Sequence, residues 1–225
     1  RAQSKVRSLI RAARDIGEGP TTNVLEIRAA IARAAPANLP ASVRAPDDRD
    51  CPPAELDIMP DGTVPMAGST DLQSLAHCDT VYFSLRNRGR KPIDVTPLYI
   101  DAGGGIDYMG PVEGLRLLPD APARIVPITV LTFDQKAGAS FPLGLERLLF
   151  IAVEQEDKTP LPADFRYLAQ PALLRNAKPV GGSAAFRALL EAAAFGAPRN
   201  RTLAKSPAIG NAGIAQYRWK IVAPE

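Results

Sequence analysis

Histidine and cysteine are scarce in this sequence, and the scarcity limits the chemistry available to it. The only histidine, His77, stands next to Cys78, and the only other cysteine is Cys51. Adjacent residues on a strand point to opposite faces, so His77 and Cys78 are poorly placed to act as a base and a nucleophile. Two cysteines and one histidine are one ligand short of a structural zinc site unless Asp50 or Asp79 joins them. We therefore predict no catalytic residue, no metal and no cofactor.

Long apolar runs are also missing. No segment approaches the roughly 18 consecutive apolar residues that a membrane-spanning helix needs, so we expect no membrane insertion. The sequence starts at Arg1 without a methionine and without a signal-like apolar segment, which favours a soluble piece of a longer chain. The parent's targeting sequence would then be missing as well.

Positive charge is in slight excess and is spread along the chain. The formal net charge is +3 and the sequence pI is about 9.0. The densest basic cluster comprises Arg86, Arg88, Arg90 and Lys91, at the end of an expected strand and in the turn after it. Nucleic-acid binding would need exposed aromatic residues among these charges, or a helix that reads a groove, and neither is evident. We interpret the cluster as a solvated turn and expect no nucleic-acid partner.

The two cysteines suit a disulfide better than a metal site. A Cys51–Cys78 bridge would close a loop of about 28 residues and stabilise the fold by roughly 3 kcal/mol in the chain-entropy model. It would also attach an irregular segment to the first core strand. Such a bridge requires an oxidising compartment, which favours a periplasmic or secreted location over a cytoplasmic one.

The chain divides into a helical start and a β-rich body. Residues 1–16 have apolar residues at helical spacing, ending at Gly17, and we interpret residues 1–20 as a helical linker from an upstream domain. Residues 21–225 are expected to form a single domain. Within it, residues 35–74 are rich in proline and aspartate and predict an irregular excursion, with a short strand near residues 56–59. Residues 160–213 predict a helical tail insertion.

Residues 23–34 fit two structures. Asn23 and Glu26 resemble a capping box in an alanine-rich helix. The alternation of Leu25, Ile27 and Ile31 with polar or small residues instead fits a half-buried strand. We favour the strand, because the rest of the domain needs strand partners.

Alternating apolar residues predict a series of strands from Val81 onwards. Proline and glycine turns separate them at intervals of about ten residues, without helices between them. This spacing predicts an immunoglobulin-like antiparallel β-sandwich, a mainly β fold. We expect strands at residues 81–87, 93–100, 106–109, 115–117, 125–133, 148–153 and 217–222.

Three features add detail to this outline. Pro97 predicts an edge strand or a bulge, after which Leu98 and Ile100 would take over the inward face. Residues 148–153 are nearly all apolar, as expected of a central strand buried on both faces. Ser183 is a good N-cap for a helix that Gly196 ends.

Two glycine-rich motifs and several carboxylates are candidates for binding or catalytic sites. Residues 103–105 lack the helix and lysine of a phosphate loop and predict a hairpin connection, and residues 181–183 predict a helix cap. Glu146, at the start of the apolar strand, is expected to be a structural hydrogen-bond or ion-pair anchor. The sequence spacing does not pair any other candidate carboxylate with a second carboxylate. These candidates are Asp101, Asp107, Glu154 and Glu156.

Several segments, taken in order, resemble the accessory domain that follows the peptidase domain in many bacterial caspase-like (metacaspase-related) proteins. They are His77–Arg88, Asp94–Ile106, Pro142–Arg147, Asp164–Pro171 and Ala188–Arg201. The resemblance spans about residues 77–202, and each motif alone is weakly specific. The His-Gly and nucleophile-cysteine motifs of the family's peptidase domain have no match here, so no catalytic residue is carried over.

The resemblance implies a non-catalytic accessory, regulatory or protein-binding module. Its partner would be the upstream peptidase domain or the substrates of that domain. The alternative is a stand-alone envelope or secreted structural domain that a disulfide stabilises. Candidate partner contacts are Tyr82, Arg86, Arg88, Arg90, Tyr99 and Tyr108.

Overall fold

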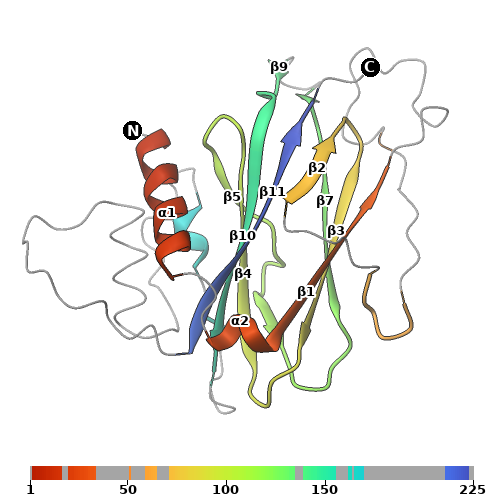
Figure 1. Ribbon diagram of the computed structural model, residues 1–225, viewed down its shortest axis with the longest axis vertical. Coiled ribbons are helices and arrows are strands. Elements are labelled where there is room, and N and C mark those ends of the chain that lie inside the picture. The colour runs from red at the N-terminus through yellow and green to blue at the C-terminus, as the bar shows by residue number, and fades with distance from the viewer. Residues whose placement is uncertain are drawn as a thin grey trace, which may run out of the picture.

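A computed structural model describes most of the β-rich body of the chain (Figure 1). The described residues are 2–16, 20–33, 51, 59–64, 71–134, 139–155, 162–163, 165–169 and 211–222. Among the helices in these ranges, none is long and apolar enough to cross a membrane. The predicted helix at residues 183–196 lies outside the described residues. So does the short strand predicted near residues 56–59, except for Met59, which is not in a strand.

The described part is mainly β and is built from two larger sheets. Sheet A has three strands in the order β1 (Leu25–Ala32), β3 (Thr80–Asn87) and β7 (Arg124–Thr129). Sheet B has the order β2 (Asp71–Leu75), β11 (Ala212–Ile221), β10 (Gly144–Glu154), β4 (Ile93–Ile100) and β5 (Ile106–Tyr108), and β6 (Leu115–Leu117) also pairs with β4. A small hairpin joins β8 (Phe133–Asp134) to β9 (Ala139–Ser140).

The main core lies between the two sheets, where alternate residues of their strands meet. Phe83 of sheet A and Phe150, Tyr217 and Trp219 of sheet B are at its centre. The ring of Phe83 lies 5.3 Å from that of Phe150 and 5.0 Å from that of Tyr217, both in edge-to-face geometry. Such aromatic pairs each add about 0.5–1.5 kcal/mol to the free energy of burying the rings. The only tryptophan thus lies inside the body, as the alternation of residues 217–222 predicts.

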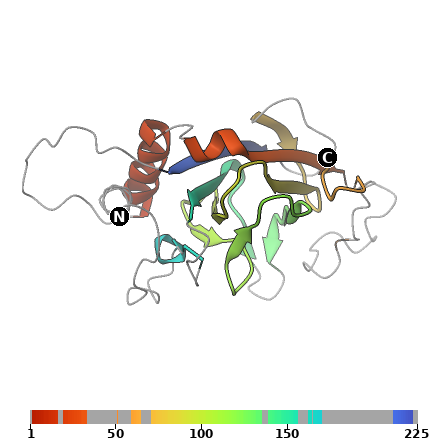
Figure 2. The ribbon, with the colours of Figure 1, turned by 90° about the horizontal axis from the view of Figure 1, so that it is seen from below.

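A second core lies on the other face of sheet B. Helix α1 (Ala2–Ile16) buries Leu9, Ala12 and Ala13 there, at the helical spacing that the sequence predicts. Residues 163 and 165–169, with a short 3₁₀ helix at Arg166–Leu168, pack against the same face. Figure 2 shows α1 to one side of the strands. The predicted linker helix is therefore packed as part of the folded body.

Strand β10 has a partner on each side and a core on each face. It pairs with β11 and with β4, and residues 148–153 are all buried. Its even-numbered residues face the main core and its odd-numbered residues face α1. The predicted central strand is confirmed, and it is longer than expected because it starts at Gly144.

The prediction made from Pro97 is wrong. Strand β4 is an internal strand and alternates without interruption: Ile93 and Val95 face the main core, and Leu98 and Ile100 face the second core. The carbonyl of Pro97 accepts a hydrogen bond from the N–H of Met109, and the nitrogen of an extended residue points to the same side as its carbonyl. On that side β6 pairs only with residues 93–95 and β5 only with residues 98–100. The missing donor therefore falls in the gap between two short strands.

The irregular excursion predicted for residues 35–74 contains a strand at its end. Strand β2 begins at Asp71 and pairs in parallel with β11, so sheet B is mixed and the prediction of a wholly antiparallel fold is wrong. All other described pairings are antiparallel. Residues 59–64 form a turn stabilised by a hydrogen bond from the N–H of Gly62 to the carbonyl of Met59.

The segment that fits either a helix or a strand in the sequence is mostly a strand in the structure. Helix α2 (Pro20–Val24) is a short turn, and β1 follows it at once. Strand β1 pairs with β3 over its whole length, from Leu25 opposite Asn87 to Ala32 opposite Thr80. The predicted strand is confirmed. Asn23 lies in the last turn of α2, so the capping box predicted from it does not start a helix.

Candidate functional site

The candidate site is a network of charged side chains on the outer face of sheet A, which we call the sheet A network. Residues 25 and 29 of β1 and residues 83 and 85 of β3 enter the main core. Because successive residues of a strand point to opposite faces, Glu26, Arg28 and Arg86 lie on the outer face. The register places Glu26 opposite Arg86 and Arg28 opposite Ser84.

The turn at residues 59–64 lies over this face. Thr63 and Val64 are almost fully buried, and the Val64 N–H donates to the Ser84 hydroxyl at 3.2 Å. The Asp61 carboxylate accepts hydrogen bonds from the N–H of Thr63 at 3.0 Å and from its hydroxyl at 2.6 Å. Gly62 has φ +78°, the left-handed conformation that glycine tolerates best. The turn thus fixes Asp61 next to β3.

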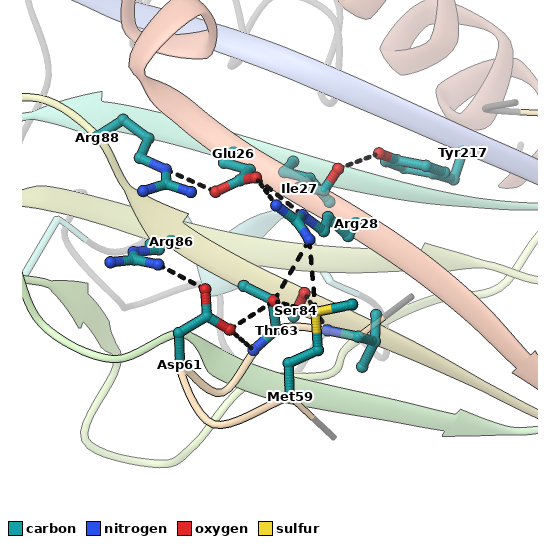
Figure 3. A network of polar contacts seen from close by, with 11 residues as sticks. Glu26, Ile27, Arg28, Met59, Asp61, Thr63, Ser84, Arg86, Arg88 and Tyr217 are labelled. Carbon is teal, nitrogen blue, oxygen red and sulfur yellow. Dashed lines mark hydrogen bonds and ion pairs between the residues drawn. The ribbon is translucent and has the colours of Figure 1, made fainter. Parts of the chain in front are cut away.

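The sheet A network joins three guanidinium groups to two carboxylates (Figure 3). Glu26 accepts from Arg28 at 2.8 Å and from Arg88 at 2.7 Å. Asp61 accepts from Arg86 at 2.7 Å. Arg28 also donates to the Thr63 hydroxyl at 3.4 Å, which connects the two parts. With three positive and two negative groups, the network has one positive charge in excess.

The network remains ionised over a wide pH range. Burial raises the pKa of Glu26, but hydrogen bonds from Arg88 and Arg28 outweigh burial and hold the pKa below its ordinary value. Hydrogen bonds from the Thr63 hydroxyl and N–H lower the pKa of Asp61, and the Arg86 charge adds to them. The hydrogen bond to Glu26 raises the pKa of Arg88. Mild acid therefore leaves the charges in place.

The candidate partner contacts do not form one patch. Tyr82 and Arg86 are both even-numbered residues of β3, so their side chains lie on the same outer face of sheet A. Tyr82 is half-buried there. Arg88 follows β3, and Arg90 is exposed in the turn beyond it. The interpretation of this turn as merely solvated misses the ion pairs that Arg86 and Arg88 form.

The two remaining candidates lie in sheet B. Tyr99 stacks on Trp219, with 6.0 Å between ring centroids, and its hydroxyl donates to Glu146. The Tyr108 hydroxyl donates to the Pro111 carbonyl at 2.8 Å, and the Arg166 guanidinium lies 5.3 Å from the Tyr108 ring centroid. Both tyrosines are thus engaged in contacts within the domain.

Four members of the sheet A network were missed from the sequence: Glu26, Arg28, Asp61 and Thr63. The alternation of β1 places Glu26 and Arg28 on one face, which is a usable signal. The Pro60-Asp61-Gly62 sequence is typical of a turn with an aspartate bonded to its own backbone. Nothing local indicates that this turn would pack over β3, because that contact joins residues twenty or more positions apart.

The two cysteines are paired, as predicted. Their sulfur atoms are 2.04 Å apart, and Cys78 lies in the turn just before β3. His77 Nε2 is 3.9 Å from the Cys51 sulfur, while Nδ1 accepts from the Thr132 N–H at 3.0 Å. That bond assigns the single ring proton of neutral His77 to Nε2.

The trio of Cys51, His77 and Cys78 groups three potential metal ligands within 4.8 Å. In this state they do not suit a metal ion. The paired sulfurs are not thiolates, and Nε2, the histidine nitrogen that faces them, holds the ring proton. The arrangement fits a structural bridge next to a buried neutral histidine.

Glu146 is the hydrogen-bond anchor that the sequence predicts. It is 5% exposed, and its carboxylate accepts from the Tyr99 hydroxyl and from Trp219 Nε1, the latter at 3.0 Å. Burial raises the pKa of Glu146 despite these bonds. Burial and the neighbouring Glu146 charge also raise the pKa of Tyr99, which therefore keeps its proton and donates.

The glycine-rich segment at residues 103–105 is the hairpin connection that the sequence predicts. It joins β4 to β5, and Gly104 donates to the Asp101 carbonyl at 3.1 Å. The Asp101 side chain accepts from the N–H of Gly105 at 2.8 Å. Asp101 is therefore part of the turn.

No family model, curated protein or solved structure matches this chain.

Proposed function

We propose that this domain is a non-catalytic accessory module with an immunoglobulin-like fold that binds an acidic surface of a partner protein through the sheet A network. The observation that carries the proposal is the excess positive charge of the network. Three arginines share two carboxylates there, and the exposed Arg90 lies in the adjoining turn.

Charged groups of this kind favour the recognition of a partner. Arginine is enriched in protein interfaces, and complementary charges orient a partner and speed its association. Arg88 has a side chain that is 47% exposed, against 23% for its partner Glu26. Arg88 can therefore exchange part of its contact with Glu26 for a carboxylate on another protein without leaving the surface.

The resemblance to the accessory domains of bacterial caspase-like proteins supplies the candidate partner. It is the peptidase domain that would precede Arg1, or a substrate of that peptidase. The test is to sequence the gene upstream of Arg1, produce any caspase-like domain encoded there and titrate it against this domain by calorimetry. An upstream region without the His and Cys motifs of a caspase-like peptidase would contradict this choice of partner.

Charge reversal tests the face itself. Arg88→Glu combined with Arg90→Glu is expected to weaken the complex by roughly tenfold or more at low salt, and by less at high salt because ions screen surface charges. Arg7→Glu combined with Arg11→Glu is the matched control with the same charge change, because Arg7 and Arg11 are exposed residues of α1, which packs on sheet B. An equal loss in both variants would show that net charge acts rather than this face.

A second function is favoured by the pairing of Cys51 with Cys78. A stand-alone envelope or secreted structural domain would use such a bridge for stability outside the cell. Thiol titration of denatured protein from its native compartment separates the two proposals. Two free thiols would count against the envelope function, whereas a full bridge together with no caspase-like gene upstream would favour it.

A further inference from the structure

An apolar segment is exposed where the chain enters β10. Phe141, Leu143 and Leu145 are 44%, 50% and 49% exposed, and Pro142 between them is exposed as well. We call residues 141–145 the apolar tip. Figure 1 shows β9, which directly precedes the tip, at one end of the two sheets. A run of exposed apolar residues is unfavourable in water, so the tip points to a binding surface.

Neighbouring segments brace the backbone of the tip. The N–H of Phe141 donates to the carbonyl of Thr132 at 3.0 Å. Pro142 lies against the hairpin between β4 and β5, where a Cβ atom placed on Gly103 would lie 3.0 Å from the proline Cγ. The apolar side chains are therefore presented from a supported backbone, and a partner need not order the tip before binding it.

The tip adjoins the face of sheet B that α1 covers. Leu145 of β10 stands directly opposite Lys220 of β11, and opposite residues of paired strands share a face. This is the α1 side, because odd-numbered residues of β10 face the second core. Arg218 is on the same face, but it lies in register beside Asp71 of β2 and has further contacts within the chain. We therefore leave Arg218 out of the surface charge.

Helix α1 adds a stripe of positive charge to this side of the molecule. Arg7, Arg11 and Arg14 are all exposed, and their spacing of four and three residues places them on one helix face. Arg14 lines the same cavity as Arg147, which is the next residue after Leu145 on that face of β10, so the stripe reaches the sheet close to the tip. Among the α1 residues whose side chains are described, none is acidic.

We propose that this face binds the surface of an anionic membrane, with the apolar tip in the interfacial region and the α1 arginines and Lys220 against the headgroups. Buried apolar area and attraction to anionic lipids are the two forces that hold a protein on such a surface. Nucleic acid is disfavoured because its bases stack on aromatic rings, whereas the tip presents two leucines and one phenylalanine.

This binding is peripheral and requires no membrane-spanning helix. It also does not depend on the proposed protein-binding function, because the sheet A network lies on the other sheet. Each basic residue near an anionic surface tightens binding by about fivefold, so several weak contacts together give a measurable affinity.

The test is co-sedimentation of the whole chain with lipid vesicles. Vesicles of phosphatidylcholine that contain phosphatidylserine are compared with vesicles of phosphatidylcholine alone. We expect at least about tenfold tighter binding to the anionic vesicles, and a loss of affinity as salt screens the charges.

Leucine variants test the apolar tip. Leu143→Ser and Leu145→Ser are each expected to weaken binding to anionic vesicles by roughly threefold or more, because each removes apolar area from the contact. Leu118→Ser is the matched control, since Leu118 is 53% exposed and follows β6, which pairs with residues 93–95 at the other end of β4 from the tip. The control should change the affinity by less than about twofold.

A charge variant tests the α1 stripe. Arg11→Gln should weaken binding by about fivefold at low salt and by less at high salt. Arg124→Gln makes the same charge change at an exposed position of β7 in sheet A and should have less than about a twofold effect. All these substitutions are at exposed positions, and melting curves verify that each variant is folded.

Three results would overturn the proposal. One is equal binding, or no binding, to the two kinds of vesicle. Another is an unchanged affinity in both Leu143→Ser and Leu145→Ser. The third is binding to a single-stranded oligonucleotide that exceeds vesicle binding and is unaffected by Leu143→Ser, which would assign the basic face to nucleic acid.

Discussion

Replacing Glu146 by alanine should strongly destabilise this domain. The carboxylate is buried, and it accepts hydrogen bonds from the Tyr99 hydroxyl and from Trp219 Nε1. The side chain of Trp219 is fully buried, and Glu146 is the acceptor for its N–H. Two side-chain donors would lose their acceptor inside the domain, and the backbone N–H of Ala102 would lose its hydrogen bond to the carboxylate.

The expected cost follows from those two donors. Leaving a buried donor unsatisfied costs about 1–3 kcal/mol, so Glu146→Ala should lower the free energy of unfolding by roughly 2–5 kcal/mol. Tyr99→Phe removes one donor but leaves the carboxylate bonded to Trp219, and should cost about 1.5–3 kcal/mol. Because both variants remove the same bond, the double variant should cost less than the sum of the two.

The assay is urea unfolding followed by tryptophan fluorescence, since the single Trp219 is itself in the network. Glu154→Ala is the matched control. Glu154 is on the same strand, and its only described ion pair is a 3.5 Å contact with Lys91 at a partly exposed position. The control should change stability by no more than about 1 kcal/mol.

The pH dependence gives an independent check. Burial raises the folded-state pKa of Glu146 above the unfolded value of about 4.5, so folding favours its protonated form. This contribution to stability is fully present below the unfolded pKa and is lost as pH rises through the folded pKa. Unmodified protein should therefore gain stability relative to Glu146→Gln as pH falls into that range. A loss for Glu146→Ala below about 1 kcal/mol, or the opposite pH trend, would refute this account of Glu146.

Three further predictions concern other parts of the body. Replacing both Cys51 and Cys78 by alanine should lower the free energy of unfolding by about 3 kcal/mol, measured by urea unfolding. Burial lowers the pKa of His77 in the folded protein, so folding favours the neutral imidazole. The resulting contribution to the free energy of unfolding is present above about pH 6.5 and is lost as pH falls through the folded pKa. Melting curves of His77→Gln should lack this loss. Gly104 has φ +89°, so Gly104→Ala should cost about 1–2 kcal/mol in thermal melting, whereas no change would contradict the left-handed turn.

Local patterns were enough to predict most strands of this domain. The alternation of residues 81–87 and 217–222 identifies β3 and β11 because one face of each strand is apolar. The apolar run at residues 148–153 identifies β10 because it is buried on both faces. Glu146 is identified as an anchor because a carboxylate at the start of such a run needs partners to be buried.

Features that depend on distant pairing could not be predicted in this way. Strand β2 has the polar sequence DLQSL and pairs with β11, more than one hundred residues away. Pro97 indicated an edge strand because no local signal shows that β5 and β6 leave a gap beside it. The opposition of Arg147 and Arg218 is likewise a matter of register between β10 and β11. The sheet A network also arises from such long-range contacts.

The central claim is that the outer face of sheet A binds an acidic protein partner. The most direct measurement is the affinity of this domain for any caspase-like peptidase domain that the gene encodes upstream of Arg1, compared between unmodified protein and the Arg88→Glu, Arg90→Glu double variant. We predict a measurable complex that the double variant weakens by roughly tenfold or more and that the Arg7→Glu, Arg11→Glu control leaves unchanged. An upstream peptidase domain that does not bind, or one that binds both variants equally, would contradict the claim.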